Sequence, residues 1–270
     1  MIQIIHLSDF HLNEKNLKDW KDFVKTAFVG KIKELNIDMG TTIIVCTGDL
    51  IDKGNLNFDK SKKSFELFKE EVLDCISNEL SIPIERILVV PGNHDMVRGN
   101  DSVRNELGNR EYYKTYNNIL TSSREILDKD EREGVKRNIP FSEFNEMLYN
   151  GVENMYSSFL GNAIFYDFDG EKIGVACLNS SWRCYDDNDK NYLILGEEPL
   201  KRCTEHIKHC DVKIALMHHP LDWFNLEQGI TTAHISKDYD VLLVGHVHES
   251  QTITQTGFSG TLFTNIAPSC

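Results

Sequence analysis

Short apolar runs rich in β-branched residues recur along the chain, and they constrain its fold more than any other feature. Runs of this length and composition predict buried strands. Segments with helical periodicity lie between several of them, so strand and helix alternate. This alternation predicts an α/β fold with a largely parallel sheet. The runs are Ile2–Ile5, Thr41–Cys46, Ile87–Val90, Ile173–Leu178, Val212–Met217 and Val241–Val244.

The segments between the runs differ in character. Leu17–Leu35 and Glu198–His209 have helical spacing. Residues 96–160 are polar and show no convincing strand before Ala163–Phe168, so we expect a mostly helical insertion or cap there. Glu249–Ile266 alternates Thr, Gln and Gly with apolar residues, which predicts antiparallel hairpin strands that start a second sheet. The clearest helical stripe is Phe65, Phe68, Val72, Leu73, Ile76 and Leu80.

The composition excludes several classes of protein. The chain is 40% hydrophobic and 26% charged, and this composition excludes a disordered or a fibrous protein. Its length of 270 residues suits one large domain, so we expect a single domain over residues 1–270. Seven cysteines without a CxxC pair favour reduced thiols in the cytoplasm. No apolar run approaches the roughly 18 residues that would span a bilayer. The net charge of −13 argues against broad contacts with nucleic acid or an anionic membrane.

Clusters of Asp, His and Asn follow five of the apolar runs. Ligand sites of α/β sheets form outside the carboxyl ends of the strands, so these clusters can converge on one crevice. In an extended segment residues i and i+2 point the same way, so each D-x-H or H-x-H segment can present two ligand atoms. The clusters are Asp9-Phe-His11, Gly48-Asp49-Leu-Ile-Asp52-Lys53-Gly54, Gly92-Asn93-His94-Asp95, His218-His219-Pro220 and Gly245-His246-Val247-His248.

The residue types in these clusters indicate a metal site. Carboxylate, imidazole and amide oxygen, with no thiolate among them, suit Mn²⁺, Fe²⁺ or Zn²⁺ better than a cysteine-bound structural zinc. The five clusters, in this order, resemble the calcineurin-like metallophosphoesterases. That resemblance implies a four-layer α/β/β/α sandwich with two divalent metal ions at the strand ends, and manganese is the favoured metal.

The resemblance also implies a role for each matching residue. One metal ion is expected on Asp9, His11 and His248, and the other on Asn93, His218 and His246, with Asp49 bridging both. A hydroxide shared between the two ions is the expected nucleophile. His94 is expected to face the leaving group as a general acid or an electrostatic stabiliser.

Four further residues have weaker assignments. Asp52 lies where the Ser/Thr phosphatase branch has an Asp that orients the catalytic His, so we expect it to hydrogen-bond His94. Lys53 stands where those phosphatases carry an Arg for phosphate. His219 is expected beside the ligands or near the substrate, and Trp223 is a candidate for stacking on a base or sugar.

The sequence favours hydrolysis of a nucleotide-like phosphodiester. The alternative is a metal-dependent DNA or RNA nuclease domain of a larger protein. A protein phosphatase is disfavoured by Lys53, and an inactive scaffold by the intact ligand positions. Family members usually add a strand after a segment like the one that ends at Cys270, so we expect the N-terminal catalytic part of a longer protein. No oligomeric state is favoured.

Overall fold

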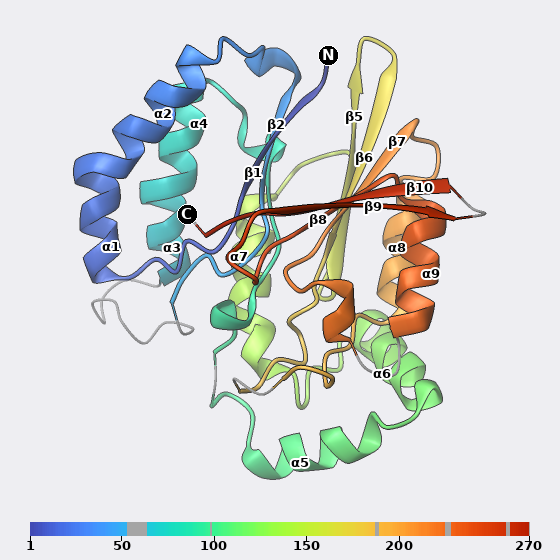
Figure 1. Cartoon of the computed structure of the whole chain (residues 1–270). Coiled ribbons are helices and arrows are strands. Elements are labelled where there is room, and N and C mark those ends of the chain that lie inside the picture. Colours follow the sequence, from blue (N-terminus) through green and yellow to red (C-terminus); the bar gives the residue numbers. More distant parts are fainter. Residues whose placement is uncertain (53–63, 98, 187–188, 225–227, 258–259, 270) are drawn as a thin grey trace.

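The computed structural model describes residues 1–52, 64–97, 99–186, 189–224, 228–257 and 260–269. Two sheets form its centre. Helices α1 (Glu14–Asp19), α2 (Lys25–Glu34) and α4 (Asp74–Leu80) cover one sheet, and α8 (Glu197–His206) and α9 (Gln228–Asp238) lie against the other (Figure 1). The order helix, sheet, sheet, helix confirms the predicted α/β/β/α sandwich.

The smaller sheet contains three parallel strands, β1 (Gln3–Leu7), β2 (Thr42–Cys46) and β3 (Ile87–Val89), in that order. Every residue of β2 is buried, as expected for a central strand covered on both faces. Helix α3 (Ser64–Phe68) continues through a π-helical turn, Lys69–Leu73, into α4. All six residues of the predicted apolar stripe on this segment are buried.

The larger sheet has the order β4-β5-β6-β7-β8-β10-β9. Its pairs from β6 to β10 are parallel, and an antiparallel hairpin lies at each edge. The alternating apolar runs therefore predicted the parallel centre correctly. The strands are β4 (Met155–Ser158), β5 (Gly161–Phe168), β6 (Glu171–Leu178), β7 (Val212–Leu216), β8 (Val241–Val244), β9 (Gln251–Gly257) and β10 (Gly260–Ile266).

Two expectations about strands were wrong. Met155–Ser158 forms β4 in a region expected to lack strands, because its pairing with β5 and not an apolar pattern of its own decides its conformation. The C-terminal hairpin does not start a second sheet. Its strand β10 pairs in parallel with β8, and Leu262 and Ile266 are buried, so the hairpin completes the sheet that begins at β4.

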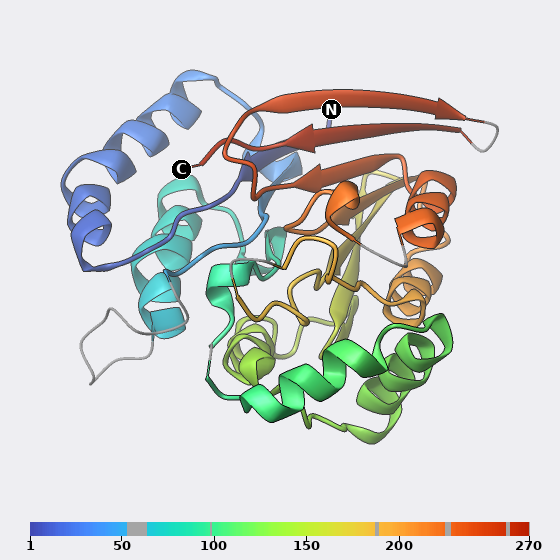
Figure 2. The ribbon, with the colours of Figure 1, turned by 60° about the horizontal axis from the view of Figure 1, so that its bottom comes forward.

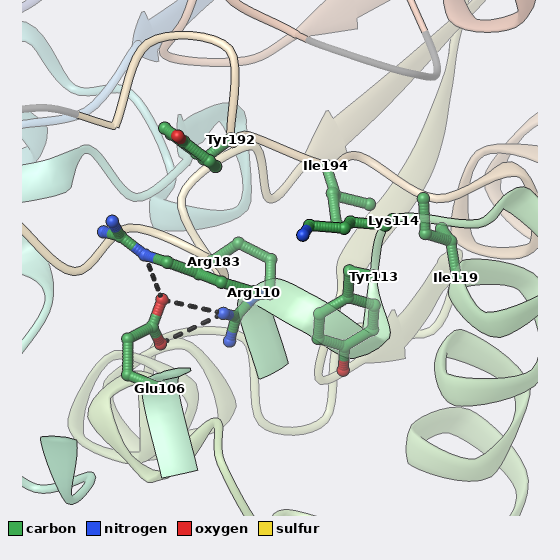
Figure 3. Close-up of a pocket in the computed structure, with 8 residues that line it drawn as sticks. All are labelled: Glu106, Arg110, Tyr113, Lys114, Ile119, Arg183, Tyr192 and Ile194. Carbon is green, nitrogen blue, oxygen red and sulfur yellow. Dashed lines mark hydrogen bonds and ion pairs between the residues drawn. The ribbon is translucent and has the colours of Figure 1, made fainter. Parts of the chain in front are cut away.

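The segment expected to be helical contains α5 (Val103–Tyr112), α6 (Tyr116–Lys129) and α7 (Ile139–Leu148), and α5 and α6 lie across one end of the molecule (Figure 2). Buried Glu106 joins α5 to the loop after β6, because Arg183 donates to both of its carboxylate oxygens at 3.0 Å (Figure 3). Arg137 donates to Glu106 as well, at 2.9 Å. No helix in the described part of the chain is long and apolar enough to cross a membrane.

Candidate metal centre

Backbone hydrogen bonds bring the loops after the strands to one place. The amide of Asp9 donates to the carbonyl of Gly48 at 3.0 Å, and His11 donates to the carbonyl of Asp49 at 2.8 Å. The amide of Gly245, in the loop after β8, donates to the carbonyl of His218, after β7, at 3.0 Å. The backbone amide of His246, after β8, donates to Asp9 Oδ2, after β1, at 3.1 Å. The carboxyl ends of strands from both sheets therefore meet, as expected for a site built on strand ends.

Five of the expected ligands have left-handed backbone conformations. The values of φ are 56° at Asp9, 44° at His11, 50° at Asp49, 71° at His246 and 62° at His248. The expectation that each pair lies on one side of an extended segment was therefore wrong. The pairs converge because tight turns aim them inward, and such costly conformations persist only where the surrounding structure holds them.

Two glycines allow the loops to approach this closely. A Cβ atom at Gly92 would lie 2.1 Å from Asp49 Oδ1 and 2.3 Å from the Asp49 amide. A Cβ atom at Gly245 would lie 2.0 Å from Ser8 Oγ. Contacts this short do not occur between real atoms, so only glycine fits at either position.

Asp9, His11 and His248 form one group of facing side-chain atoms. His248 Nε2 lies 3.2 Å from Asp9 Oδ1 and 3.4 Å from His11 Nε2. Asp49 Oδ2 is 3.7 Å from His11 Nε2. Asp9 Oδ1 is buried, yet no described residue donates a hydrogen bond to it. A buried carboxylate oxygen of this kind fits a cation ligand.

Asn93, His218 and His246 form the second group. His218 Nε2 lies 3.1 Å from Asn93 Oδ1, 3.1 Å from His246 Nδ1 and 3.4 Å from Asp49 Oδ2. The other ring nitrogen of His218, Nδ1, is 2.7 Å from the carbonyl of Thr47. If Nδ1 donates to that carbonyl, Nε2 presents a lone pair, and it faces an amide oxygen and a carboxylate oxygen that also carry lone pairs. Such a set of acceptors fits a divalent cation.

The pKa values of Asp49, His218 and His246 are shifted by burial and by the charges of neighbouring groups. Burial alone would raise the pKa of Asp49, but the charge of His218 holds it well below its usual range. Burial lowers the pKa of His218, and Asp49 overcomes this effect and raises it to about 9. Burial and the charge of His218 lower the pKa of His246 to about 3. Asp49 therefore makes His218 bind its proton more tightly than an ordinary histidine does.

His94 and Asp52 form the predicted pair. His94 Nδ1 lies 3.1 Å from Asp52 Oδ1, and the backbone amide of His94 donates to Asp49 Oδ1 at 2.8 Å. The His94 ring also packs edge-on against His11, with 4.5 Å between the ring centroids. His94 thus lies beside the first group and beside Asp49. Lys53, expected near the substrate, lies outside the described residues.

His219 lies buried behind His218. Its Nδ1 is 3.0 Å from Ser180 Oγ, and its Nε2 is 3.8 Å from Cys184 Sγ. Ser180 Oγ also accepts the backbone N–H groups of His218, at 3.2 Å, and of His219, at 3.1 Å. His219 therefore lies beside two of the expected ligands, and it could also join His218 and His246 in a group of three imidazoles.

Ser180, which follows β6 directly after Asn179, was not predicted from the sequence. The rule that polar residues after a strand build the site applies to it as well.

Asp95 has a structural position that the sequence did not predict in detail. Its carboxylate accepts backbone N–H groups from Leu50 at 3.2 Å, Ile51 at 3.0 Å and Gly92 at 2.7 Å. Burial and the charge of Asp49 raise its pKa to about 7.

Trp223 lies at the edge of the second group. Its ring centroid is 4.1 Å from that of His246, in an edge-to-face arrangement. The ammonium group of Lys190 lies 5.3 Å from the same ring centroid. Trp223 is therefore close enough to the expected ligands to contact a substrate bound there.

Comparisons with known proteins identify the family of the chain. The family model of the calcineurin-like phosphoesterases matches residues 2–250. A hypothetical protein from Thermus thermophilus is 13% identical, with a TM-score of 0.40, over 98% of this chain and 75% of that one. The sulfate thiohydrolase SoxB of Thermus thermophilus is 10% identical, with a TM-score of 0.47, over 98% of this chain and 51% of that one. No curated protein sequence matches the chain.

Proposed function

Because the chain belongs to the calcineurin-like phosphoesterase family, whose members are metal-dependent hydrolases, we propose that it hydrolyses nucleotide-like phosphodiesters with two divalent metal ions. One observation carries the proposal. Asp49 Oδ2 lies within 4 Å of a nitrogen from each ligand group, His11 Nε2 on one side and His218 Nε2 on the other. A carboxylate in this position suits two neighbouring cations that share a ligand.

The proposed ligands fall into two sets. Asp9, His11 and His248 would hold one ion, and Asn93, His218 and His246 would hold the other, with Asp49 available to both. Two bound ions would polarise the phosphoryl oxygens and lower the pKa of bound water toward neutrality. Mn²⁺ is our first choice, and Fe²⁺ or Zn²⁺ would suit the same donors.

His94 would interact with the oxygen of the leaving group. Its Nδ1 is engaged by Asp52, so Nε2 is the nitrogen available to a substrate. The Asp52 carboxylate accepts a hydrogen bond from Nδ1–H, so the second proton of a doubly protonated ring lies on Nε2. His94 would then donate a proton or a hydrogen bond to the leaving oxygen. Asp52 acts through His94 and is a positioning residue.

A substrate panel tests the proposal and its alternatives. The Mn²⁺-loaded protein is assayed with bis-p-nitrophenyl phosphate, cyclic nucleotides, single- and double-stranded DNA and a phosphorylated peptide. Turnover of the small diesters without cleavage of DNA supports the proposal. Cleavage of DNA would favour a nuclease, and turnover of the peptide alone a protein phosphatase. Absence of all turnover would favour an inactive scaffold.

The location of the protein belongs to the same proposal. The seven cysteine positions are scattered along the sequence without a CxxC pair, which suits a reducing compartment, so we propose a cytoplasmic location. Growth and fractionation of the native host, followed by detection of the protein, would test this location.

A further inference from the structure

A cleft of about 750 Å³ opens beside the candidate metal centre, and His246 is one of its lining residues. It lies between the β9–β10 hairpin on one side and the start of α9 with the preceding turn on the other; Figure 2 shows the hairpin beside α9. The cleft is large enough to enclose a nucleoside-sized molecule.

One wall of the cleft is a single face of the sheet. Gln251, Ile253 and Gln255 alternate along β9, so their side chains point to the same side. Thr264 pairs with Ile253 and lies on that face of β10. This wall offers amide and hydroxyl groups, which both donate and accept hydrogen bonds, around an apolar centre.

The opposite wall contains Trp223, which is half-buried and contacts His246. Lys190 lies over the Trp223 ring and is 3.6 Å from Asp222. Both charged side chains are more than half exposed, so their ion pair holds them weakly and the ring can be uncovered at little cost. The two charges cancel, so the cleft suits an uncharged ring better than a second phosphate.

We propose that this cleft binds the nucleoside part of the substrate, with the base against Trp223 and its polar edge toward Gln251, Gln255 and Thr264. This inference rests on the proposed function, because it assumes that the phosphate lies at the metal centre. An aromatic wall recognises the face of a base, and a glutamine amide can pair with the edge of adenine. The cleft thus selects a nucleoside diester over a simple alkyl or aryl diester.

Binding without metal tests the cleft separately from hydrolysis. Adenosine is titrated into EDTA-treated protein and tryptophan fluorescence is followed, with ribose 5-phosphate as the probe that lacks a base. Trp20 and Trp182 are buried, with 6% and 0% of their surfaces exposed, so quenching by a ligand reports mainly on Trp223. We expect adenosine to quench the fluorescence and ribose 5-phosphate to leave it unchanged.

Variants then locate the bound base. Gln255→Ala should weaken adenosine binding, measured by equilibrium dialysis, by about tenfold, as expected for loss of a hydrogen-bonding partner of the base. Trp223→Ala should weaken it by at least as much. Thr254→Ala is the matched control, because Thr254 neighbours Gln255 on β9 but points to the other side of the sheet. It should bind adenosine like the wild type.

The outcomes separate this proposal from the function itself. The ratio of kcat/KM for adenosine 5′-(p-nitrophenyl phosphate) to that for bis-p-nitrophenyl phosphate should fall about tenfold in Gln255→Ala. Turnover of bis-p-nitrophenyl phosphate without any adenosine binding would contradict the nucleoside site and leave the proposed hydrolysis supported. Adenosine binding without turnover of any diester would support the nucleoside site and contradict the proposed hydrolysis. Equal adenosine affinity in the wild type, Gln255→Ala and Trp223→Ala would also contradict the nucleoside site.

Discussion

Asp49 is the residue on which the candidate site depends most. It is buried, its backbone has a positive φ of 50°, and its Oδ1 accepts the amide of His94. Its Oδ2 faces the two groups of imidazole nitrogens. A buried carboxylate that the surrounding backbone positions so closely, at a conformational cost, is typical of a functional residue.

Replacing a single ligand should lower the metal content of the protein. His248→Ala removes the nitrogen 3.2 Å from Asp9 Oδ1, so we expect a loss of about 10- to 100-fold or more in affinity at one of the two sites. The metal content after dialysis against Mn²⁺ is measured by atomic spectroscopy. His234→Ala is the control, because His234 lies outside all the ligand groups. Unchanged metal content in His248→Ala would contradict the ligand assignment.

The pair of His94 and Asp52 predicts graded effects on turnover. His94→Ala should lower kcat by about 10²- to 10⁴-fold, as expected for loss of a general acid. Asp52→Asn preserves the side-chain shape and removes the charge 3.1 Å from His94 Nδ1, so its effect should be smaller and should change the pH profile of kcat. Steady-state kinetics from pH 5 to 9 measure both. An unchanged pH profile in Asp52→Asn would argue against a positioning role.

At the scale of elements, the loops after the strands carry the site, and they are fixed by contacts with one another. Asp95 connects the loops after β2 and β3 through three backbone N–H groups. Ser180 connects the loop after β6 with that after β7. Each loop therefore depends on its neighbour, and a change that separates two loops should damage the whole site.

Gly92→Ala tests this dependence. The new Cβ would lie 2.1 Å from Asp49 Oδ1, so either Asp49 or the loop must move. We expect a loss of about 1–3 kcal/mol in the free energy of unfolding, and a lower metal content. Gly108→Ala is the matched control, because a Cβ at this position in α5 meets no atom within 4 Å. It should be neutral or stabilising by up to about 1 kcal/mol. Urea unfolding measures both.

The attachment of α5 predicts a second effect at this scale. Glu106→Gln removes the one charge of the carboxylate to which Arg137 and Arg183 donate, and both guanidinium groups are buried. Leaving buried charges without a full partner should lower the free energy of unfolding by about 3–5 kcal/mol. Glu111→Gln, on the exposed side of the same helix, should cost less than about 1 kcal/mol. Equal effects in urea unfolding would show that the buried cluster adds no stability.

At the scale of the whole molecule, the two sheets meet beside the candidate site. His6 of β1 lies between them, with Nδ1 2.9 Å from Asn265 Oδ1 of β10 and Nε2 2.9 Å from Thr47 Oγ1. The smaller sheet supplies Asp9, Asp49 and Asn93, and the larger sheet supplies the histidines after β7 and β8. The site is complete only when the two sheets are packed together.

This contact predicts a pH dependence of stability. Burial lowers the pKa of His6 below its ordinary value of 6.5, although Asn265 and Asp9 act in the opposite direction. The unfolded chain therefore binds a proton at a higher pH than the folded protein does, so the contribution of His6 to stability falls as the pH drops below 6.5. The metal-free wild type should lose more stability than His6→Gln between pH 7 and 5. Urea unfolding in EDTA at both pH values measures the difference, and equal losses would contradict the prediction.

The sequence by itself determined the elements and the chemical character of the site. Apolar runs such as Thr41–Cys46 became strands because their side chains must be buried, whichever partners they find. The acids, amides and imidazoles after these runs indicated a cation site before any contact was known. The hydrogen bond between Asp52 and His94 was expected from the resemblance to the phosphatase branch of the family.

The tertiary structure decided what depends on contacts between distant segments. Strand β4 exists because it pairs with β5, and β10 joins β8 although the local pattern indicated only a hairpin. The left-handed turns at the ligands and the place of Ser180 behind His218 follow from the packing of neighbouring loops. The cleft beside Trp223 also forms only when the β9–β10 hairpin is placed next to α9. Local sequence cannot specify these features, because their energies come from residues far away along the chain.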